Sequence, residues 1–298
     1  MSAAATTPAS VQRGLSAPSP PSACKAELVC CPMNNGARMP VLGFAPIFTG
    51  GRDSCLQAAL DAGFRHFVLE KNSVNDQLIG SVMKDWYRSG RLSRDDLFLA
   101  VKIDGSEIQK VTTNIPQRLH DLGCGYLDLV VLTNEFEDSV DSLKEKWTTL
   151  EKAVKTGYCR SLGISGPPMV VADLEELCKT CVIKPSLYLV EGRSKSIFAQ
   201  LPRLEMYTKY RGIQTAINVR VDEISAQIPG GLKQLQKQVF QYSRSPSQVL
   251  VRYFSQRGLT VICESGESQT TTNCFKVLDF LISPDDMADI TRILLKQL

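Results

Sequence analysis

The chain has 298 residues, of which 43% are hydrophobic and 22% charged, with a formal net charge of +3. This composition is typical of a soluble globular protein, and a single α/β barrel of about 250 residues would account for most of the length. No stretch approaches the roughly 20 consecutive apolar residues that a membrane span requires. The small net charge is spread along the chain, which argues against nucleic acid as the main partner. We therefore expect a protein that binds neither a membrane nor nucleic acid.

The chain contains ten cysteines, a high number. Several stand where small core residues would stand, among them Cys159, Cys263 and Cys274, and a buried free Cys behaves as a small hydrophobic residue. With no apolar signal segment at the start, they indicate reduced thiols in a cytoplasmic protein. Cys178 and Cys181 form a CxxC pair that could be redox-active or bind a metal, but no second pair has the spacing of a zinc site. We expect two neighbours at a helix end, and no metal site.

Residues 1–26 are rich in Ala, Ser, Thr and Pro, with no acidic residue before Glu27. Too few large apolar side chains are present to offset the entropy of ordering, so the segment predicts a disordered tail before one barrel domain at 27–298. An acid-poor tail with Arg13 and Lys25 also faintly resembles an organellar transit peptide, although its basic count is low and no amphipathic helix is visible. Whether the tail is a targeting segment stays open.

From about residue 38, short apolar or β-branched runs alternate with helical patterns. Such alternation indicates βαβ units and a parallel sheet. Eight strands in about 250 residues favour a closed (β/α)8 TIM barrel over an open sheet, and the GxGxxG fingerprint of the open dinucleotide-binding fold is absent. The predicted strands are Val41–Phe44, His66–Leu69, Leu97–Ile103, Leu127–Leu132, Cys159–Ser165, Ser186–Val190, Ile213–Val219 and Leu259–Cys263.

Helix signals fall between these strands. Leu56–Ala62 runs into Gly63, a typical helix stop, and Asp141–Lys155 has apolar residues at steps of three and four. Ser283–Leu298 begins with a capping Ser, then Pro and two acids, which predicts a helix start. An Asn-Gly turn at Asn34–Gly36 predicts a short N-terminal hairpin that could close the bottom of the barrel.

The order of the motifs resembles the aldo-keto reductase family, with the pattern of its aldose and hydroxysteroid reductase group. The resemblance implies the (β/α)8 barrel. It rests on Met39–Phe44, Ala62–His66, Asp95–Phe98, Val101–Lys102, Gly125–Leu129, Leu162–Ser165, Lys184–Glu191 and Ser283–Met287.

The family reduces carbonyls with NADPH, using a Tyr, a Lys, an Asp and a His at the barrel mouth. The Tyr must donate a proton near neutral pH, so the Lys, paired with the Asp, has to lower its pKa from about 10. The resemblance implies that Lys102 occupies the position of the family's Lys. The positions of the family's Asp, Tyr and His hold Val68, Ser73 and Thr133, in that order. We expect Lys102 to be a remnant, exposed in a polar mouth or paired with an acid such as Glu70, while a residual catalytic role stays open.

Two tyrosines could in principle supply the missing acid. Tyr126 matches an ordinary family Tyr and is expected to pack, and Tyr188 stands at a cofactor-side Asn. We expect neither to restore catalysis.

The cofactor positions are changed in the same way. The resemblance implies contacts to NADPH from an Asn, a Gln, a stacking aromatic residue, a Lys and an Arg. In this chain those positions hold Gly166, Leu189, Asn218, Glu264 and Gln269, in that order.

Three polar residues of the cofactor site remain, namely Ser165, Ser265 and Asn273. Ser265 and Asn273 could still meet a ribose or an adenine. Alternatively they belong to a polar surface and a helix start with Ser268 or Thr270 as its N-cap.

The sequence therefore predicts an inactive pseudoenzyme with impaired NADPH binding, used for binding or regulation. It would be a monomer with no cofactor, or with NADP(H) or NAD(H) if any, and with an unidentified protein partner. The loop after Thr133 is shortened to Asn134–Glu137, and a mouth without lids excludes water poorly. The alternative is an active NAD(P)H-dependent carbonyl oxidoreductase with a different proton donor or cofactor, since Glu264 could accept from the ribose hydroxyl of NADH. A third possibility is an eroded sequence without a selected role.

Overall fold

A computed structural model of the chain describes residues 29–48, 54–71, 74–134, 139–167, 169, 171–191, 197–220 and 232–295. The predicted tail at 1–26, Ser73 and the loop residues 135–137 lie outside these ranges.

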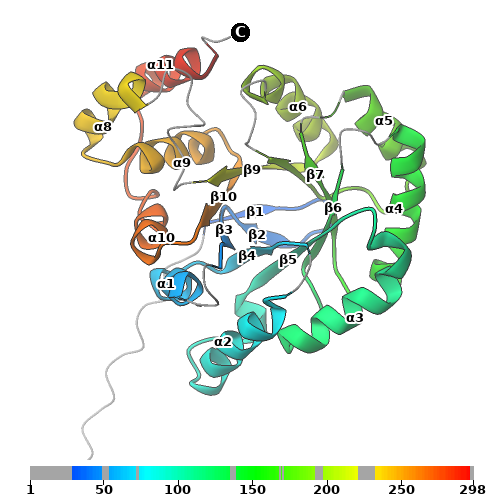
Figure 1. The fold of residues 1–298 in the computed structure, drawn as a ribbon. Helices are drawn as coiled ribbons and strands as arrows, with labels where there is room; N and C mark the ends of the chain where they lie inside the picture. Colours follow the sequence, from blue (N-terminus) through cyan, green and yellow to red (C-terminus); the bar gives the residue numbers. More distant parts are fainter. Residues whose placement is uncertain are drawn as a thin grey trace, which may run out of the picture.

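Eight parallel strands close into a barrel in the order β10-β3-β4-β5-β6-β7-β8-β9 (Figure 1). The ring closes where β10 pairs with β3, with Val261 opposite Leu42. The predicted (β/α)8 barrel is thus confirmed. The observed ends of β4 are those predicted. The largest difference between a predicted and an observed strand end is at the start of β7, which was predicted at Cys159 and lies at Leu162. The strands are β3 (Leu42–Pro46), β4 (His66–Leu69), β5 (Phe98–Ile103), β6 (Leu129–Thr133), β7 (Leu162–Gly166), β8 (Leu187–Glu191), β9 (Gln214–Arg220) and β10 (Thr260–Ser265).

The helices surround this barrel as an outer ring (Figure 1). They are α1 (Ser54–Ala62), α2 (Asp76–Arg88), α3 (Val111–Leu122), α4 (Val140–Lys155), α5 (Val171–Thr180), α6 (Ile197–Arg211), α8 (Gln236–Tyr242), α9 (Pro246–Gln256), α10 (Ser268–Phe275) and α11 (Pro284–Leu295). Short 3-10 turns are η1 (Arg94–Asp96), η2 (Ile108–Lys110) and η4 (Leu232–Leu235). Over the described ranges, none of the helices has both the length and the apolar character to cross a membrane.

The predicted helix ends follow local chemistry. Gly63 ends α1 with φ +112°, a backbone conformation that favours glycine. Ser283 caps α11, because its hydroxyl accepts a bond of 3.2 Å from the backbone N–H of Asp286.

Two apolar cores flank the sheet, because successive side chains of a strand point to opposite faces. One core lies between the strands and the helices and includes Trp147, whose indole donates to the Ile183 carbonyl at 2.8 Å. The other fills the inside of the barrel. Its members are Met33, Met39, Ala45, Val68, Phe98, Ala100, Leu129, Val131, Leu187, Leu189, Ala216 and Ile262.

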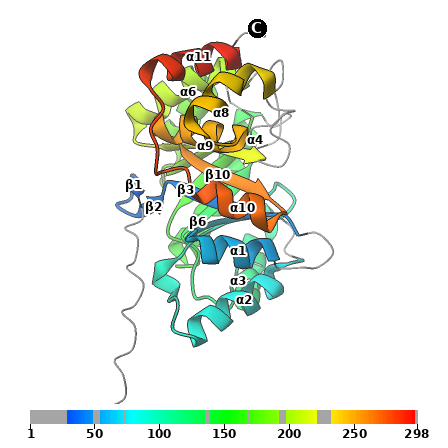
Figure 2. The ribbon, with the colours of Figure 1, turned by 90° about the vertical axis from the view of Figure 1, so that its left-hand side faces the viewer.

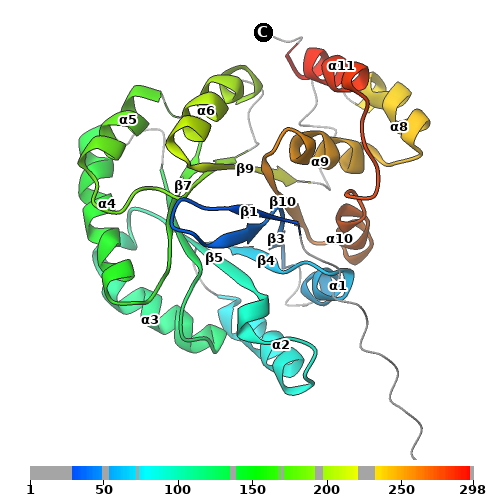
Figure 3. The same ribbon diagram turned by 180° about the vertical axis from the view of Figure 1, so that it is seen from behind.

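The predicted N-terminal hairpin is present as β1 (Cys30–Pro32) and β2 (Arg38–Pro40). It crosses one end of the barrel, as the views from behind and from the side show (Figures 3 and 2). Met33 and Met39 reach into the interior core, and Asn34 binds Ser186 through its side chain. The hairpin thus covers the bottom of the barrel, and the carboxyl ends of the strands lie at the opposite end.

Candidate functional site

Polar side chains gather at the carboxyl ends of the barrel strands. Val68, Ala100, Leu189, Ala216 and Ile262 all belong to the interior core. Since strand side chains alternate, residues two positions further along face the same side, at the mouth. These residues are Glu70, Lys102, Glu191, Asn218 and Glu264.

Lys102 is held between two carboxylates. Its Nζ lies 2.8 Å from an oxygen of Glu70 and 2.8 Å from an oxygen of Glu191, and the residue is only 4% exposed. Burial alone would lower the pKa of Lys102, but the two carboxylates outweigh it and the pKa lies above its ordinary value. The expected pairing with Glu70 is confirmed, whereas sequence reasoning missed Glu191 as the second partner.

Glu191 collects further donors. Its carboxylate accepts from the Ser165 hydroxyl at 2.7 Å and from the Asn218 amide at 3.2 Å. Burial would raise the pKa of Glu191, but Lys102 and these hydrogen bonds outweigh it, so the pKa lies below its ordinary value. Glu191 therefore stays ionised, and Ser165 is already engaged with it.

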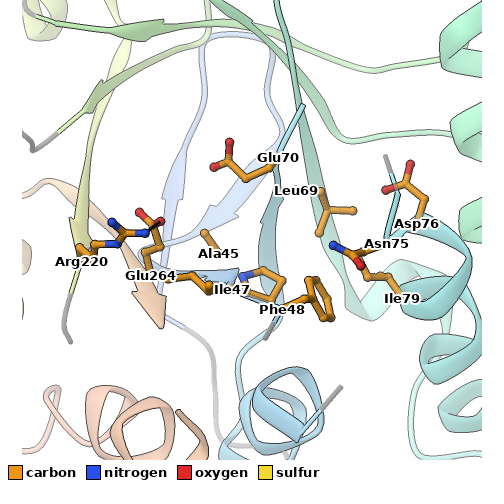
Figure 4. Close-up of a pocket in the computed structure, with 11 residues that line it drawn as sticks. Ala45, Ile47, Phe48, Leu69, Glu70, Asn75, Asp76, Ile79, Arg220 and Glu264 are labelled. Carbon is orange, nitrogen blue, oxygen red and sulfur yellow. Dashed lines mark ion pairs between the residues drawn. The ribbon is translucent and has the colours of Figure 1, made fainter. Parts of the chain in front are cut away.

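The polar chain continues across the mouth to β10. The same Asn218 amide nitrogen donates to Glu264 at 3.1 Å, and an Arg220 nitrogen lies 3.5 Å from the other oxygen of Glu264. Figure 4 shows the side chains of Arg220 and Glu264 turned toward each other. We call the connected residues the mouth network: Glu70, Lys102, Glu191, Asn218, Glu264 and Arg220.

Arg118 on α3 fixes the backbone beneath this network. It makes two bonds to the carboxylate of Asp76, at 2.7 and 3.1 Å, and both residues are 2% exposed. It also donates to the backbone carbonyls of Lys102 and Glu70, at 3.1 and 2.9 Å. Arg118 thereby sets where β4 and β5 end relative to each other.

The positions predicted to have lost catalytic groups are placed as follows. Val68 is fully buried in the interior core, one layer below Lys102, and supplies no charge. Thr133 ends β6 with a buried hydroxyl that has no hydrogen-bond partner in the described structure. Ser73 lies outside the described residues.

Neither tyrosine considered as a replacement acid belongs to the mouth network. The Tyr126 hydroxyl donates to Asp95 at 2.8 Å, and the guanidinium of Arg160 lies 3.7 Å from the centre of its ring. The Tyr188 hydroxyl donates to the Pro167 carbonyl at 2.6 Å. Burial raises the pKa of Tyr188, so it is a weaker acid than an ordinary tyrosine.

Gly166 on β7 and Leu189 on β8 stand at two of the positions that the resemblance assigns to cofactor contacts. Gly166 has φ +153°, and a Cβ at this position would lie 2.6 Å from the Asn134 carbonyl oxygen. An asparagine at 166 would thus require the backbone at Asn134 to move. Leu189 is fully buried in the interior core and offers no polar contact.

The residues after β10 serve the start of α10. Ser265 is buried, and its hydroxyl accepts from the Glu267 backbone at 3.0 Å. The prediction of Ser268 or Thr270 as N-cap is wrong, because Glu267 takes that position.

Asn273 and Gln269 both lie on α10. Asn273 accepts from Gln248 through its backbone carbonyl at 3.0 Å, and Gln269 donates to the Asn273 side chain at 3.4 Å. These contacts are those of a helix surface.

The CxxC pair lies at the end of α5, as expected, with Cys178 in its last turn and Cys181 just beyond. The negative end of a helix dipole disfavours a thiolate, and burial raises the pKa of Cys181 to about 11. The described cysteines are all free thiols. Across the described ranges, no group of three or more His, Cys, Asp or Glu side chains could hold a metal ion.

A cavity of about 280 Å³ opens beside the mouth network, between the ends of β3, β4 and β10 and helix α2. Glu70 and Glu264 form its polar side, and its apolar wall includes Ile47, Phe48 and Ile79 (Figure 4). The cavity lies close to the lower end of the usual size of ligand pockets, about 300 Å³.

The chain is similar to several reductases. It is 27% identical to the NAD(P)H-dependent D-xylose reductase of Scheffersomyces stipitis over 88% of this chain and 92% of the relative, and 26% identical to aldose reductase C of Dictyostelium discoideum over 88% of each. Two solved structures share the fold. The Schistosoma japonicum aldose reductase has a TM-score of 0.74 at 23% identity, covering 89% of this chain and 91% of that one. The Bombyx mori aldo-keto reductase in complex with NADP has a TM-score of 0.73 at 19% identity, covering 90% and 93%.

The family model for the aldo/keto reductase family matches residues 52–215, more than half of the chain. This segment runs from two residues before α1 to the start of β9 and contains Lys102 and Glu191. By sequence and by fold, the chain belongs to the aldo/keto reductase family.

Proposed function

We propose that this barrel does not reduce carbonyls and instead works as a binding or regulatory protein, a pseudoenzyme with impaired NADPH binding. The observation that carries the proposal is the fixed position of Lys102 between Glu70 and Glu191. The buried Val68, at the position implied for the catalytic Asp, supports the same proposal because it carries no charge.

The charges at the mouth oppose the chemistry of reduction. A proton donor with a pKa near neutrality needs an unopposed positive charge beside it. Here three carboxylates of the mouth network face two cations, Lys102 and Arg220. A net negative surrounding raises the pKa of a neutral acid, so a donor placed here would be weakened.

The residues present also fit NADPH poorly. Ser165 is committed to Glu191, Gly166 has no amide side chain, and Asn218 offers no aromatic face. Glu264 puts a carboxylate where the family resemblance implies a lysine. This carboxylate would repel the 2′-phosphate of NADPH, which carries a charge of about −2. The ion pair with Arg220 offsets part of this repulsion, so it is weaker than the sequence alone suggests.

Two measurements on the purified protein test the proposal. The first follows NADPH or NADH consumption with small aldehydes, and the second follows protein fluorescence and melting temperature as each cofactor is added. The D-xylose reductase of Scheffersomyces stipitis serves as the positive control. We expect no turnover. We also expect no rise in melting temperature, whereas a cofactor that bound only the folded state would raise that temperature.

Submillimolar NADPH binding would overturn the proposal. Turnover with NADH that is lost in Lys102→Ala would instead establish an active oxidoreductase with altered cofactor preference. A cytoplasmic location and a monomeric state belong to the same proposal, and light scattering of the full chain tests the latter.

A further inference from the structure

Helix α6 carries apolar side chains on the face that is turned away from the barrel. Its inner face is buried through Leu201, Leu204 and Thr208, whereas Met206 and Tyr210 are 71% and 82% exposed. Residues four positions apart are neighbours on the surface of a helix. Among the exposed large apolar residues of the described ranges, these two alone have that spacing. Single exposed apolar residues are common, but a continuous apolar surface indicates a binding face.

A cavity of about 530 Å³ opens beside this pair, between α6, the start of β9 and the turn before β10. It lies at the hairpin end of the barrel and shares no residue with the mouth network. Exposed Met206 and Pro202 line it together with the buried side chains of Ile213 and Leu259. Its volume is within the usual range of ligand pockets, about 300–1,000 Å³. We call these four residues and Tyr210 the α6 groove.

The charges around the α6 groove are mainly positive. Arg203 and Lys209 are exposed on α6, and neither forms an ion pair with another described residue. Arg211, at the end of the helix, is paired with a glutamate of α5. The one acidic residue of α6 is Glu205, and Arg257 binds its carboxylate. Two positive charges are therefore left over, which favours a partner with negative charge.

These charges argue against a second copy of the chain in the groove. Two antiparallel α6 helices packed about Met206 would bring Arg203 of one copy opposite Lys209 of the other, and like charges repel. Two unpaired cations also neutralise few phosphates, which disfavours a nucleic acid. A concave groove fits a protruding side chain better than a lipid surface. An acidic peptide with an apolar side chain matches both the charge and the shape.

We propose that the α6 groove binds an acidic peptide segment of a partner protein. One apolar side chain of the segment enters the cavity against Ile213 and Leu259, and its carboxylates lie beside Arg203 and Lys209. Peptides commonly bind grooves through apolar anchors, and complementary charges add specificity and speed association. The inference rests on the proposed function, because it names the class of partner that a barrel used for binding would take.

Fluorescence anisotropy of labelled synthetic peptides, titrated with the full chain, tests the groove. The first peptide is a repeat of two glutamates and one leucine. The second has lysine in place of glutamate, and the third has serine in place of leucine. We expect the first to bind and the other two to bind at least tenfold more weakly, because one has the wrong charge and the other lacks the anchor.

Two substitutions in the groove have matched controls elsewhere on the surface. Lys209→Glu and Met206→Ser are each expected to weaken binding of the acidic peptide at least fivefold. Lys84→Glu makes the same change of charge at an exposed lysine of α2, and Phe240→Ser removes an exposed apolar side chain from α8. Both controls should leave the affinity unchanged. Melting curves of all four variants show that they are folded.

Equal binding of the lysine or serine peptide, unchanged affinity in both groove variants, or no binding of the acidic peptide would each overturn the α6 groove. Binding of the chain to vesicles of anionic phospholipid that Met206→Ser abolishes would also overturn it, in favour of a membrane surface. An NADPH titration of the same sample separates the two proposals. Binding of NADPH would overturn the proposed function, whereas failure of the acidic peptide without NADPH binding overturns only the α6 groove.

Discussion

The ammonium of Lys102 on β5 lies 2.8 Å from the carboxylate of Glu191 on β8, so this ion pair spans the mouth of the barrel between strands that are not neighbours. The Lys102 side chain is 5% exposed and that of Glu191 is 21% exposed, while Glu70, the other partner, is 53% exposed. Glu191 is consequently the partner that depends more on Lys102, since solvent can screen Glu70 but screens Glu191 far less.

Replacing Lys102 tests this difference. Lys102→Met leaves Glu191 buried without its counter-charge, which is expected to lower the free energy of unfolding by about 3 kcal/mol at pH 8. The loss should shrink toward pH 5, because Glu191 can then take up a proton. Urea denaturation at both pH values measures it. Glu70→Gln, at the exposed partner, should cost at most about 1 kcal/mol. A larger cost for Glu70→Gln than for Lys102→Met would contradict this ranking.

The buried His66 predicts a loss of stability in mild acid. Burial lowers the pKa of His66 from 6.5 to about 4, and its bond to the Pro40 carbonyl offsets this only in part. The unfolded chain binds this proton more readily than the folded chain does. The free energy of unfolding therefore has its full value above pH 6.5 and decreases as the pH falls toward about 4. The loss amounts to roughly 3 kcal/mol.

The two histidines of the chain allow a matched comparison. His66→Asn should flatten the pH dependence between pH 6.5 and 4, although the smaller side chain lowers stability at every pH. His120→Asn should leave the dependence intact, since the His120 side chain is 83% exposed. Unfolding midpoints in urea across this range give the slope. An unchanged slope in His66→Asn would show that another group causes the acid sensitivity.

The barrel could be predicted because its signals are local. The spacing of apolar runs predicted both ends of β4 correctly, and a capping Ser predicted the start of α11. Lys102 lies on β5 and Glu70 directly follows the neighbouring strand β4, so their pairing could also be proposed from the sequence.

The wider mouth network could not be proposed in the same way. The link from Lys102 to Glu191, and from Asn218 to Glu264 and Arg220, depends on which side chains share the top layer of a closed barrel. Strand alternation would have supplied that signal once each strand end was known within one residue. The predicted strands β8 and β9 each ended one residue too early, which left Glu191 and Arg220 outside the strands.

The ion pair between Arg118 and Asp76 is expected to be a main support of the mouth. Arg118→Met leaves Asp76 buried and unpaired and frees two backbone carbonyls, which should cost about 3–5 kcal/mol. Arg88→Met, at an exposed arginine of α2, is the matched control and should change stability little. The double variant Arg118→Met with Asp76→Leu should lose less stability than the sum of the losses of the two single variants. The reason is that no unpaired charge is left in the double variant. Fully additive losses in urea denaturation would argue against the pair.

Reversing the charge at Glu264 tests whether this position keeps NADPH away. Glu264→Lys changes the local charge by two units and lies where the family resemblance implies a phosphate-binding lysine. We expect NADPH at millimolar concentration to raise the melting temperature of this variant while leaving the parent unchanged. NADH should act more weakly, because it lacks the 2′-phosphate, and 0.5 M salt should reduce the difference by screening. Glu175→Lys makes the same change in net charge on α5 and should gain nothing. If NADH and NADPH stabilise Glu264→Lys equally, or if Glu175→Lys responds as strongly, the charge of Glu264 is not what excludes the phosphate, and the lost contacts at Gly166 and Asn218 would have to account for it alone.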